Sequence, residues 1–171
     1  MKRNPITEKY IISDRVPTSL AVTKTSLANF VTTIETFFER NFDGIVTVKA
    51  NVSEQNLDYI TICAEQTAYF FKLILLSMRN EAMLHIDMSC DDENKFVVKI
   101  ESDAFADMSK SELYEIARAA RAAKFTPYEA PGAIILKRTF KTSLAYRIYA
   151  TSPSALADAF NKIFFDGKEN L

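Results

Sequence analysis

The chain carries few residues that could do covalent or metal chemistry. Its single histidine is His85, and its two cysteines, Cys63 and Cys90, are too few to build a zinc site with it. One histidine supports no Ser/His/Asp or Cys/His arrangement, and no Cys-x-x-Cys or P-loop motif occurs. The segment that remains as a candidate for chemistry is residues 77–85 (SMRNEAMLH). In it, Ser77 and Glu81 are four residues apart, which corresponds to one turn of a helix. A carboxylate such as Glu81 is able to ligate magnesium.

The composition is that of an ordinary globular protein with one domain. The chain has 171 residues, 48% of them hydrophobic, enough to bury a core without disulfides. Lys plus Arg is 21 and Asp plus Glu is 22, a balance that predicts no binding to nucleic acid or to an anionic membrane. The longest apolar stretch, residues 68–76, is interrupted by Lys72 and is too short to span a bilayer. Because the thiols are free and no secretory signal is visible, we expect a cytoplasmic protein.

Hydrophobic periodicity predicts the elements of the first half of the chain. Apolar residues at helical spacing indicate a helix over residues 27–41. Alternation of apolar and polar residues predicts strands at residues 44–52 and 59–63. Residues 64–84 are so apolar in their middle that we expect a central helix lying against the core.

In the second half, alternation predicts a hairpin over residues 84–101 with an acidic turn at 91–94. Ser109 and Glu112 match the capping box and predict an alanine-rich helix that runs to about Lys124. Three further elements are expected: a short helix at 133–140, a strand at 144–150, and a last element at 155–165 that fits either period.

This order predicts an α/β fold, a two-layer sandwich in which helices cover a mixed, mostly antiparallel sheet. We expect residues 24–171 to form this domain, and residues 1–23 to form an N-terminal arm or an extra edge element.

The order of elements resembles the ATP-binding domain of sensor histidine kinases, which belongs to the GHKL superfamily with type II topoisomerases and anti-sigma kinases. The resemblance covers about residues 24–165. Its first support is two stretches, LANFVTTIETFFERNFDGIVTVKA and AEQTAYFFKLILLSMRNEAMLH, which are similar in pattern to the kinase helix, strand and long N-box helix. The resemblance implies a nucleotide site built from three motifs.

The first family motif, Asn-x-x-x-Asn-Ala, implies two amide side chains one helical turn apart, the second of which holds magnesium. Here the alanine falls on Ala82 and a trailing histidine on His85, so Ser77 and Glu81 occupy the asparagine positions. Glu81 is longer than asparagine and adds negative charge beside a polyphosphate. Asn80 is rotated by about 100° around the helix and points away.

The second motif, Asp-x-Gly-x-Gly, implies an aspartate that binds the adenine amino group and glycines that let the backbone approach. Residues 102–108 (SDAFADM) take its place, with Ser102 at the aspartate and Ala104 and Ala106 at the glycines. Alanine in a left-handed conformation costs about 1–2 kcal/mol, so we expect a rebuilt loop. Asp103 is then either a residue of a turn or of the start of a helix, or, if the register slips by one residue, the aspartate that binds adenine.

The third motif, Gly-x-Gly-Leu, implies phosphates held by backbone N–H groups at a helix N-terminus. Residues 130–133 read APGA, and the apolar-apolar-basic run that follows is similar to that of the family. Gly132 alone remains, and Pro131 removes one N–H donor. Gly132 serves as a plain cap or holds an anion weakly.

Basic residues gather in and after the segment that forms the lid in the kinases. They form either a solvated face or a docking surface for an acidic or phosphorylated partner. These residues are Arg118, Arg121, Lys124, Lys137 and Arg138. The single histidine belongs to the first motif, so the sequence offers no acceptor for autophosphorylation on histidine.

The motif losses predict a degenerate histidine-kinase-like ATPase domain, a non-catalytic protein-interaction or regulatory module in bacterial signalling. We expect no cofactor, a vestigial site at Ser77, Glu81, Asp103 and Gly132, and a partner such as a response regulator or a sigma-factor-type regulator. The alternative is a divergent kinase or ATPase, similar to anti-sigma kinases, in which Glu81 holds magnesium against ATP and Asp103 binds adenine. A second alternative is a homodimeric structural protein whose N-terminal arm pairs with the sheet edge of a second copy.

Overall fold

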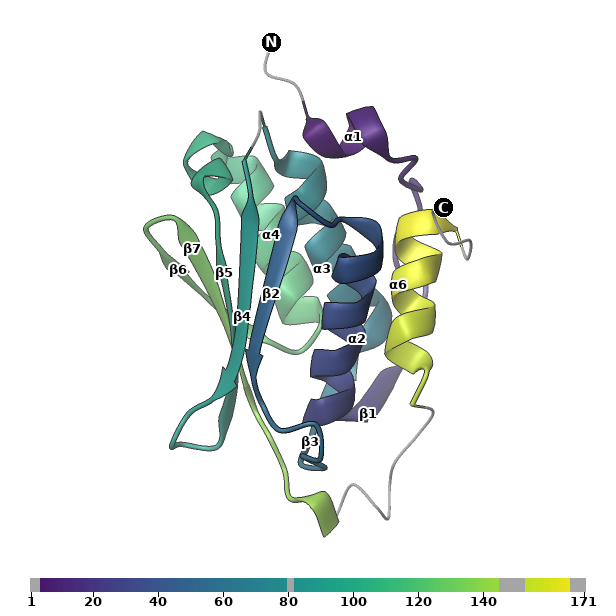
Figure 1. Cartoon of the computed structure of the whole chain (residues 1–171), viewed down its shortest axis with the longest axis vertical. Coiled ribbons are helices and arrows are strands. Elements are labelled where there is room, and N and C mark those ends of the chain that lie inside the picture. The colour runs from purple at the N-terminus through teal and green to yellow at the C-terminus, as the bar shows by residue number, and fades with distance from the viewer. Residues whose placement is uncertain (1–3, 80–81, 145–152, 167–171) are drawn as a thin grey trace.

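The computed structural model describes residues 4–79, 82–144 and 153–166, and Figure 1 shows how their helices and strands are arranged. A five-stranded sheet has the order β2-β4-β5-β7-β6. β2 runs parallel to β4, and all other neighbours are antiparallel. The strands are β2 (Val46–Asn51), β4 (Leu84–Cys90), β5 (Lys95–Glu101), β6 (Thr126–Ala130) and β7 (Ala133–Thr139).

Helices cover one face of this sheet (Figure 1). They are α2 (Leu27–Asn41), α3 (Ala64–Ser77) and α4 (Lys110–Ala122), with α6 (Ala155–Phe165) packed on α2 and α3 from the side away from the sheet. Strand residues that face the helices, such as Met88 and Val98, are buried, whereas Asp87 and Lys99 on the other face are exposed. The expected fold class, a mixed and mostly antiparallel sheet covered by helices, is confirmed.

The capping signals in the sequence start the helices where they were expected. The hydroxyl of Ser26 accepts a hydrogen bond from the Asn29 N–H at 3.0 Å, and α2 begins at the next residue, Leu27. Ser109 and Glu112 form the reciprocal capping box, which satisfies two N–H groups at the start of α4. The predicted hairpin is also present as β4 and β5.

A second sheet of two strands lies beside the helices. β1 (Val22–Ser26) pairs antiparallel with β3 (Tyr59–Cys63). Before β1, the chain forms the short helix α1 (Pro5–Lys9) near α3 and then passes α6 (Figure 1). Ile6 is fully buried, and the Ser13 N–H donates to the Phe164 carbonyl at 2.7 Å. The segment before residue 22 is therefore packed against α3 and α6.

Two expectations for secondary structure are wrong. The central helix α3 ends at Ser77 and not near residue 84. Residues 133–140 do not form a helix, because Ala133–Thr139 is the strand β7, paired with β5 and with β6. Ile134 and Leu136 in β7 are buried opposite Ile100 and Val98, the alternation of a strand rather than the period of a helix.

The ambiguous last element is the helix α6, with one face buried against α2 and α3. The expected strand at residues 144–150 falls, apart from Leu144, outside the residues that the structure describes. Among the described residues, every helix lacks the length or the hydropathy needed to cross a bilayer.

Aromatic rings fill the space between α2, α3 and α6. The ring of Phe37 lies 4.8 Å from those of both Phe160 and Phe164, measured between centroids. Phe38 contacts Phe71 of α3 edge-on at 5.5 Å. Such pairs add about 0.5–1.5 kcal/mol each beyond the burial of their area. They hold α6 firmly on the outer side of the helical layer.

One lysine is buried beside this aromatic layer. The Lys72 side chain is on α3 and only 2% of the residue is exposed. Its ammonium group donates to three backbone carbonyls, those of Ser13 at 2.7 Å, Arg15 at 2.6 Å and Ile163 at 2.9 Å. Burial lowers the pKa of Lys72 to about 8, against an opposing effect of Asp14.

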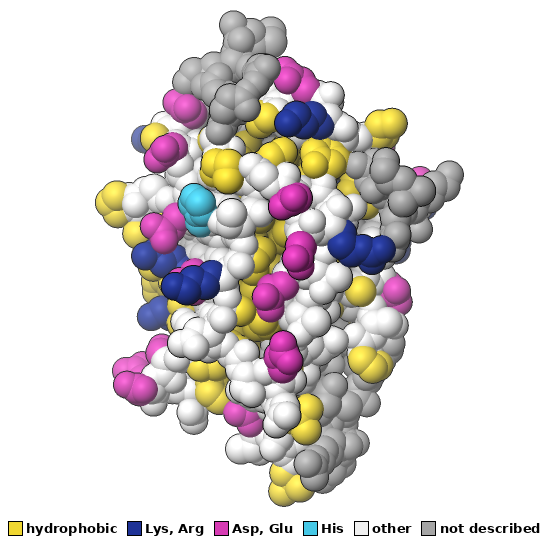
Figure 2. All heavy atoms as spheres, in the orientation of Figure 1, with side chains coloured by type: hydrophobic (Ala, Val, Ile, Leu, Met, Phe, Trp, Pro, Cys, Tyr) yellow, Lys and Arg dark blue, Asp and Glu magenta, His cyan; other side chains and the backbone are white. Residues whose placement is uncertain are grey.

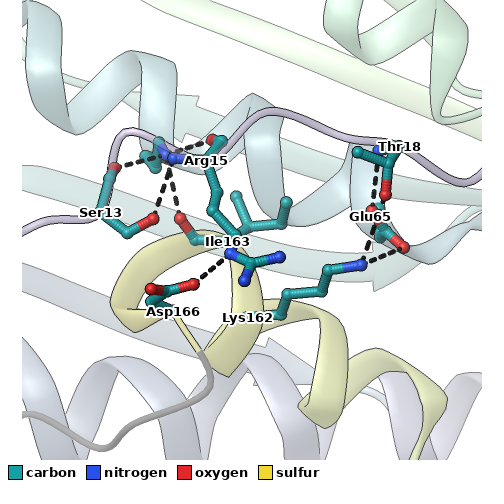
Figure 3. Close-up of polar contacts among 8 residues, drawn as sticks. Ser13, Arg15, Thr18, Glu65, Lys162, Ile163 and Asp166 are labelled. Carbon is teal, nitrogen blue, oxygen red and sulfur yellow. Dashed lines mark hydrogen bonds and ion pairs between the residues drawn. The ribbon is translucent and has the colours of Figure 1, made fainter.

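Ion pairs fix the same segments near Lys72. Figure 3 shows Lys162 of α6 reaching Glu65 of α3, with nitrogen and oxygen 3.3 Å apart. Glu65 also accepts a hydrogen bond from the Thr18 N–H at 3.0 Å. Arg15 pairs with Asp166 just after α6.

Candidate functional site

Segments that the sequence singled out for three different motifs meet at one cavity. The cavity has a volume of about 450 Å³ and lies where β4 and β7 begin and β5 ends. It brings together Ala82 and His85 of the first motif, Asp103 of the second and Gly132 of the third. The remaining described residues in its walls are Met83, Glu101, Ser102 and Pro131.

Asp103 is the first residue of a short 3-10 helix, η1 (Asp103–Asp107). Ser102 is the N-cap: its hydroxyl accepts from the Ala104 N–H at 3.1 Å. Ser102 is buried and Asp103 is exposed. The loop is thus rebuilt as a helical turn, and Asp103 stands at its entry with its side chain toward the cavity and solvent.

Gly132 lies in the tight turn between β6 and β7. Ala130 pairs with Ala133, so Pro131 and Gly132 are the two turn residues, and Gly132 has φ +68°. Proline followed by a residue with positive φ is the pattern of a type II turn. The Gly132 carbonyl accepts from the Ser102 N–H at 3.0 Å, which ties the hairpin to η1. Because a strand follows Gly132, this position has no helix N-terminus with free N–H groups to bind a phosphate.

Ser77 does not line the cavity. It is the last residue of α3, buried, and its hydroxyl is turned toward Glu112 at the start of α4. The hydrogen bond from the Ser109 N–H lowers the pKa of Glu112, and Arg79 and the Ser77 hydroxyl lower it further against burial. Arg79 pairs with Glu112 at 3.1 Å. Ser77 therefore helps to join α3 to α4.

The end of α3 has a physical cause that lies far away in the sequence. The Asn4 amide donates to the carbonyls of Leu75 and Leu76 at 3.2 and 2.7 Å, and the Met78 that follows α3 is extended and fully buried. These contacts satisfy carbonyls that a longer helix would have used. Glu81 lies outside the described residues, but α3 does not extend to its position.

The described walls of the cavity favour cations over a polyphosphate. Glu101 and Asp103 are carboxylates, and none of the described lining residues is a lysine or an arginine. His85 is hydrogen-bonded through its Nδ1 to the Thr47 hydroxyl and is the cross-strand partner of Glu101. No group of three or more potential metal ligands occurs among the described residues. The lining can accept hydrogen bonds, and no lysine or arginine in it would stabilise phosphate charge. Of its two carboxylates, Glu101 is paired with Lys99, with nitrogen and oxygen 3.5 Å apart.

The basic residues named from the sequence do not form one cluster. Arg118 pairs with Glu115 on its own helix at 3.6 Å. Arg138 faces the helices, where its guanidinium donates to the Thr61 hydroxyl at 2.7 Å. Lys137 is the next residue of the same strand and therefore faces the other side, over the ring of Tyr128.

An acidic row along α2 was not recognised from the sequence. Glu35, Glu39 and Asp43 line a groove between α2 and β2. The spacing of four residues places Glu35 and Glu39 on one face of α2, and Asp43 lies in the turn after that helix. The identity of the strand beside them was not visible, since the order of the strands in the sheet does not follow from the pattern.

No family model and no curated protein matches this chain. Among solved structures, it is similar to Acinetobacter baumannii histidine kinase AdeS, with 14% identity and a TM-score of 0.42 over 71% of this chain and 68% of that one. It is also similar to the histidine kinase domain of the Erythrobacter litoralis EL346 blue-light activated histidine kinase, with 12% identity and a TM-score of 0.37.

Both are histidine kinases. The second match covers 78% of this chain and 65% of the other. The fold class, a mixed and mostly antiparallel sheet covered by helices, follows from the strand pairing described above.

Proposed function

We propose that this chain is a non-catalytic regulatory domain with a histidine-kinase-ATPase-like fold, which acts by binding another protein in bacterial signalling. The observation that carries the proposal is the β6–β7 hairpin at Gly132. The nucleotide site that the resemblance to histidine kinases implies needs backbone N–H groups at a helix N-terminus for its phosphates. In this chain the corresponding N–H groups belong to a paired strand.

Two further features support the same proposal. α3 ends at Ser77, where Asn4 binds its last carbonyls, so the chain does not continue the helix on which a magnesium ligand would be displayed one turn later. The described cavity walls carry Glu101 and Asp103 without a lysine or arginine. A triphosphate placed there would meet the like charge of Asp103, which opposes its binding, whereas the charge of Glu101 is partly offset by Lys99.

The test is a titration of the whole protein with ATP and magnesium, followed by calorimetry and by the melting temperature. We expect no binding heat and no change in melting temperature. A true ligand at a hundred times its Kd would add about 2.7 kcal/mol to the free energy of unfolding, which a melting curve resolves easily.

Variants make the result specific. Saturable binding that is lost in Glu81→Ala and in Asp103→Asn would overturn the proposal and favour the divergent kinase or ATPase. Binding that both variants retain would also overturn it and would place the nucleotide elsewhere. A melting curve of each variant without nucleotide serves as the control for folding.

A further inference from the structure

The outer edge of β2 is unpaired in the part of the chain that the structure describes. β2 is an end strand of the five-stranded sheet and pairs there with β4 alone. Such an edge presents a row of backbone N–H and C=O groups, to which an extended chain can add as another strand. Val48 and Ala50 are half-buried toward the helices, which leaves apolar surface accessible along this edge.

A groove of about 250 Å³ runs between this edge and α2. Val46 and Val48 of β2 form one side, and Glu35 and Glu39 of α2 form the other, with Asp43 at one end. Figure 2 shows acidic side chains in a row on this face, beside a strip of apolar surface. A strand added to β2 would send every second side chain into this groove.

The acidic row is not neutralised within the described part of the chain. None of the ion pairs there involves Glu35, Glu39 or Asp43. Burial raises the pKa of Glu35, and the negative charges of Glu39 and Glu54 raise it further. Positive charge placed in the groove would relieve this repulsion.

The spacing of the acidic residues fits an extended ligand. Glu35 and Glu39 are four residues apart on a helix, which corresponds to a rise of about 6 Å. Side chains on one face of a strand repeat every two residues, or about 7 Å. Lysine or arginine at alternate positions of an added strand would therefore meet successive carboxylates.

We propose that β2 and the acidic groove bind an extended, basic segment of a partner protein, which adds to the sheet edge and directs alternate lysine or arginine side chains toward α2. This inference rests on the proposed function as a protein-binding domain, and it names the surface and the chemistry of the partner. A second copy of the chain is disfavoured as the occupant, because pairing β2 with β2 would bring two acidic rows together.

The test uses a short acetylated peptide in which lysine and threonine alternate, labelled for fluorescence anisotropy. We expect saturable binding that weakens with salt, and slower amide hydrogen exchange over Val46–Asn51 when the peptide is bound. Glu35→Gln/Glu39→Gln should weaken binding about tenfold, the effect of losing two modest charge pairs. Asp92→Asn/Glu93→Gln removes the same charge from the exposed β4–β5 turn and should leave binding unchanged.

Two control peptides separate strand addition from simple attraction of charges. A peptide with alternate N-methylated amides keeps its charge but cannot pair along that edge, and we expect it to bind much more weakly. A peptide with glutamate in place of lysine should not bind. The inference would be overturned if the N-methylated peptide bound as tightly as the unmethylated one. It would also be overturned if both double variants lost the same affinity, or if the peptide left amide exchange in β2 unchanged.

Self-association is measured in the same samples. A concentration-dependent dimer that protects the β2 amides without peptide would overturn the choice of a basic partner. The ATP titration is run in parallel. If neither the peptide nor ATP binds, the proposed role of the β2 edge is refuted, whereas the proposed loss of nucleotide binding stands.

Discussion

The buried Lys72 gives the molecule a stability that depends on pH. In the folded protein its pKa is lowered to about 8 by burial, whereas in the unfolded chain it has the ordinary value of 10.5. Between these two pH values the unfolded chain binds a proton that the folded protein does not. The free energy of unfolding must therefore rise as the pH rises through this window, and below it the folded protein bears the cost of a buried charge.

The size of the effect follows from the two pKa values. Integrating the proton linkage from about pH 7 to about pH 9.5 gives a gain of about 2 kcal/mol in the free energy of unfolding. For a domain of this size, that gain corresponds to a rise of about 4–8 °C in melting temperature. Lys72→Met removes the titrating group and should remove this gain.

The assay is urea denaturation, or thermal melting, of the wild type and Lys72→Met at a series of pH values. The difference in slope is the readout, because the carbonyls of Ser13, Arg15 and Ile163 do not titrate even though the variant leaves them without their donor. Lys49→Met, which removes an exposed lysine of β2, should keep the wild-type slope. Equal slopes in the wild type and Lys72→Met would refute the reasoning and would show that the three carbonyls stabilise the ammonium enough to cancel its burial.

Three other substitutions test features of the fold. Gly132→Ala should lower the free energy of unfolding by about 1–2 kcal/mol, because its φ is +68°. Steric overlap adds nothing, since the atom nearest to an added Cβ, the Ser102 carbonyl oxygen, is 4.0 Å away. Gly132→Asn, measured in the same denaturation series, should cost less. Asn4→Ala should cost about 2 kcal/mol, because it removes both the N-cap of α1 and the amide that binds the last carbonyls of α3. Asn4→Asp keeps the cap and should cost about half as much. Equal losses in the two variants would contradict the double role of Asn4. Phe160→Ala should cost about 3–5 kcal/mol in chemical denaturation, since its ring is fully buried between α2 and α3, and a loss under 1 kcal/mol would mean that α6 is not firmly packed.

Local signals in the sequence predicted most of the fold. The capping box at Ser109 and Glu112 and the alternation in β4 and β5 were sufficient because each depends on residues close together in the chain. The segment AIILKRTF was misread because a short apolar run after a glycine is compatible with both a helix and a strand. Its pairing with β5, which decides the matter, is a contact between distant segments.

The candidate site was predicted in part for the same reason. Asp103, Gly132 and His85 do meet at one cavity, as the motif positions implied. Ser77 points elsewhere because α3 ends there, and that end is set by Asn4, a residue separated from Leu75 by 71 positions. The role of Glu81 stays a prediction, since it lies outside the described residues.

The three acceptors of Lys72 impose an order on the folding of the chain. Two of them precede the lysine by 59 and 57 positions, and the third follows it by 91. During synthesis the ammonium group therefore cannot have all three acceptors until Ile163 has emerged from the ribosome. We expect the Lys72 side chain of α3 to become fully buried only when α6 packs against α3. The packing of these two helices would then be a late and cooperative step of folding.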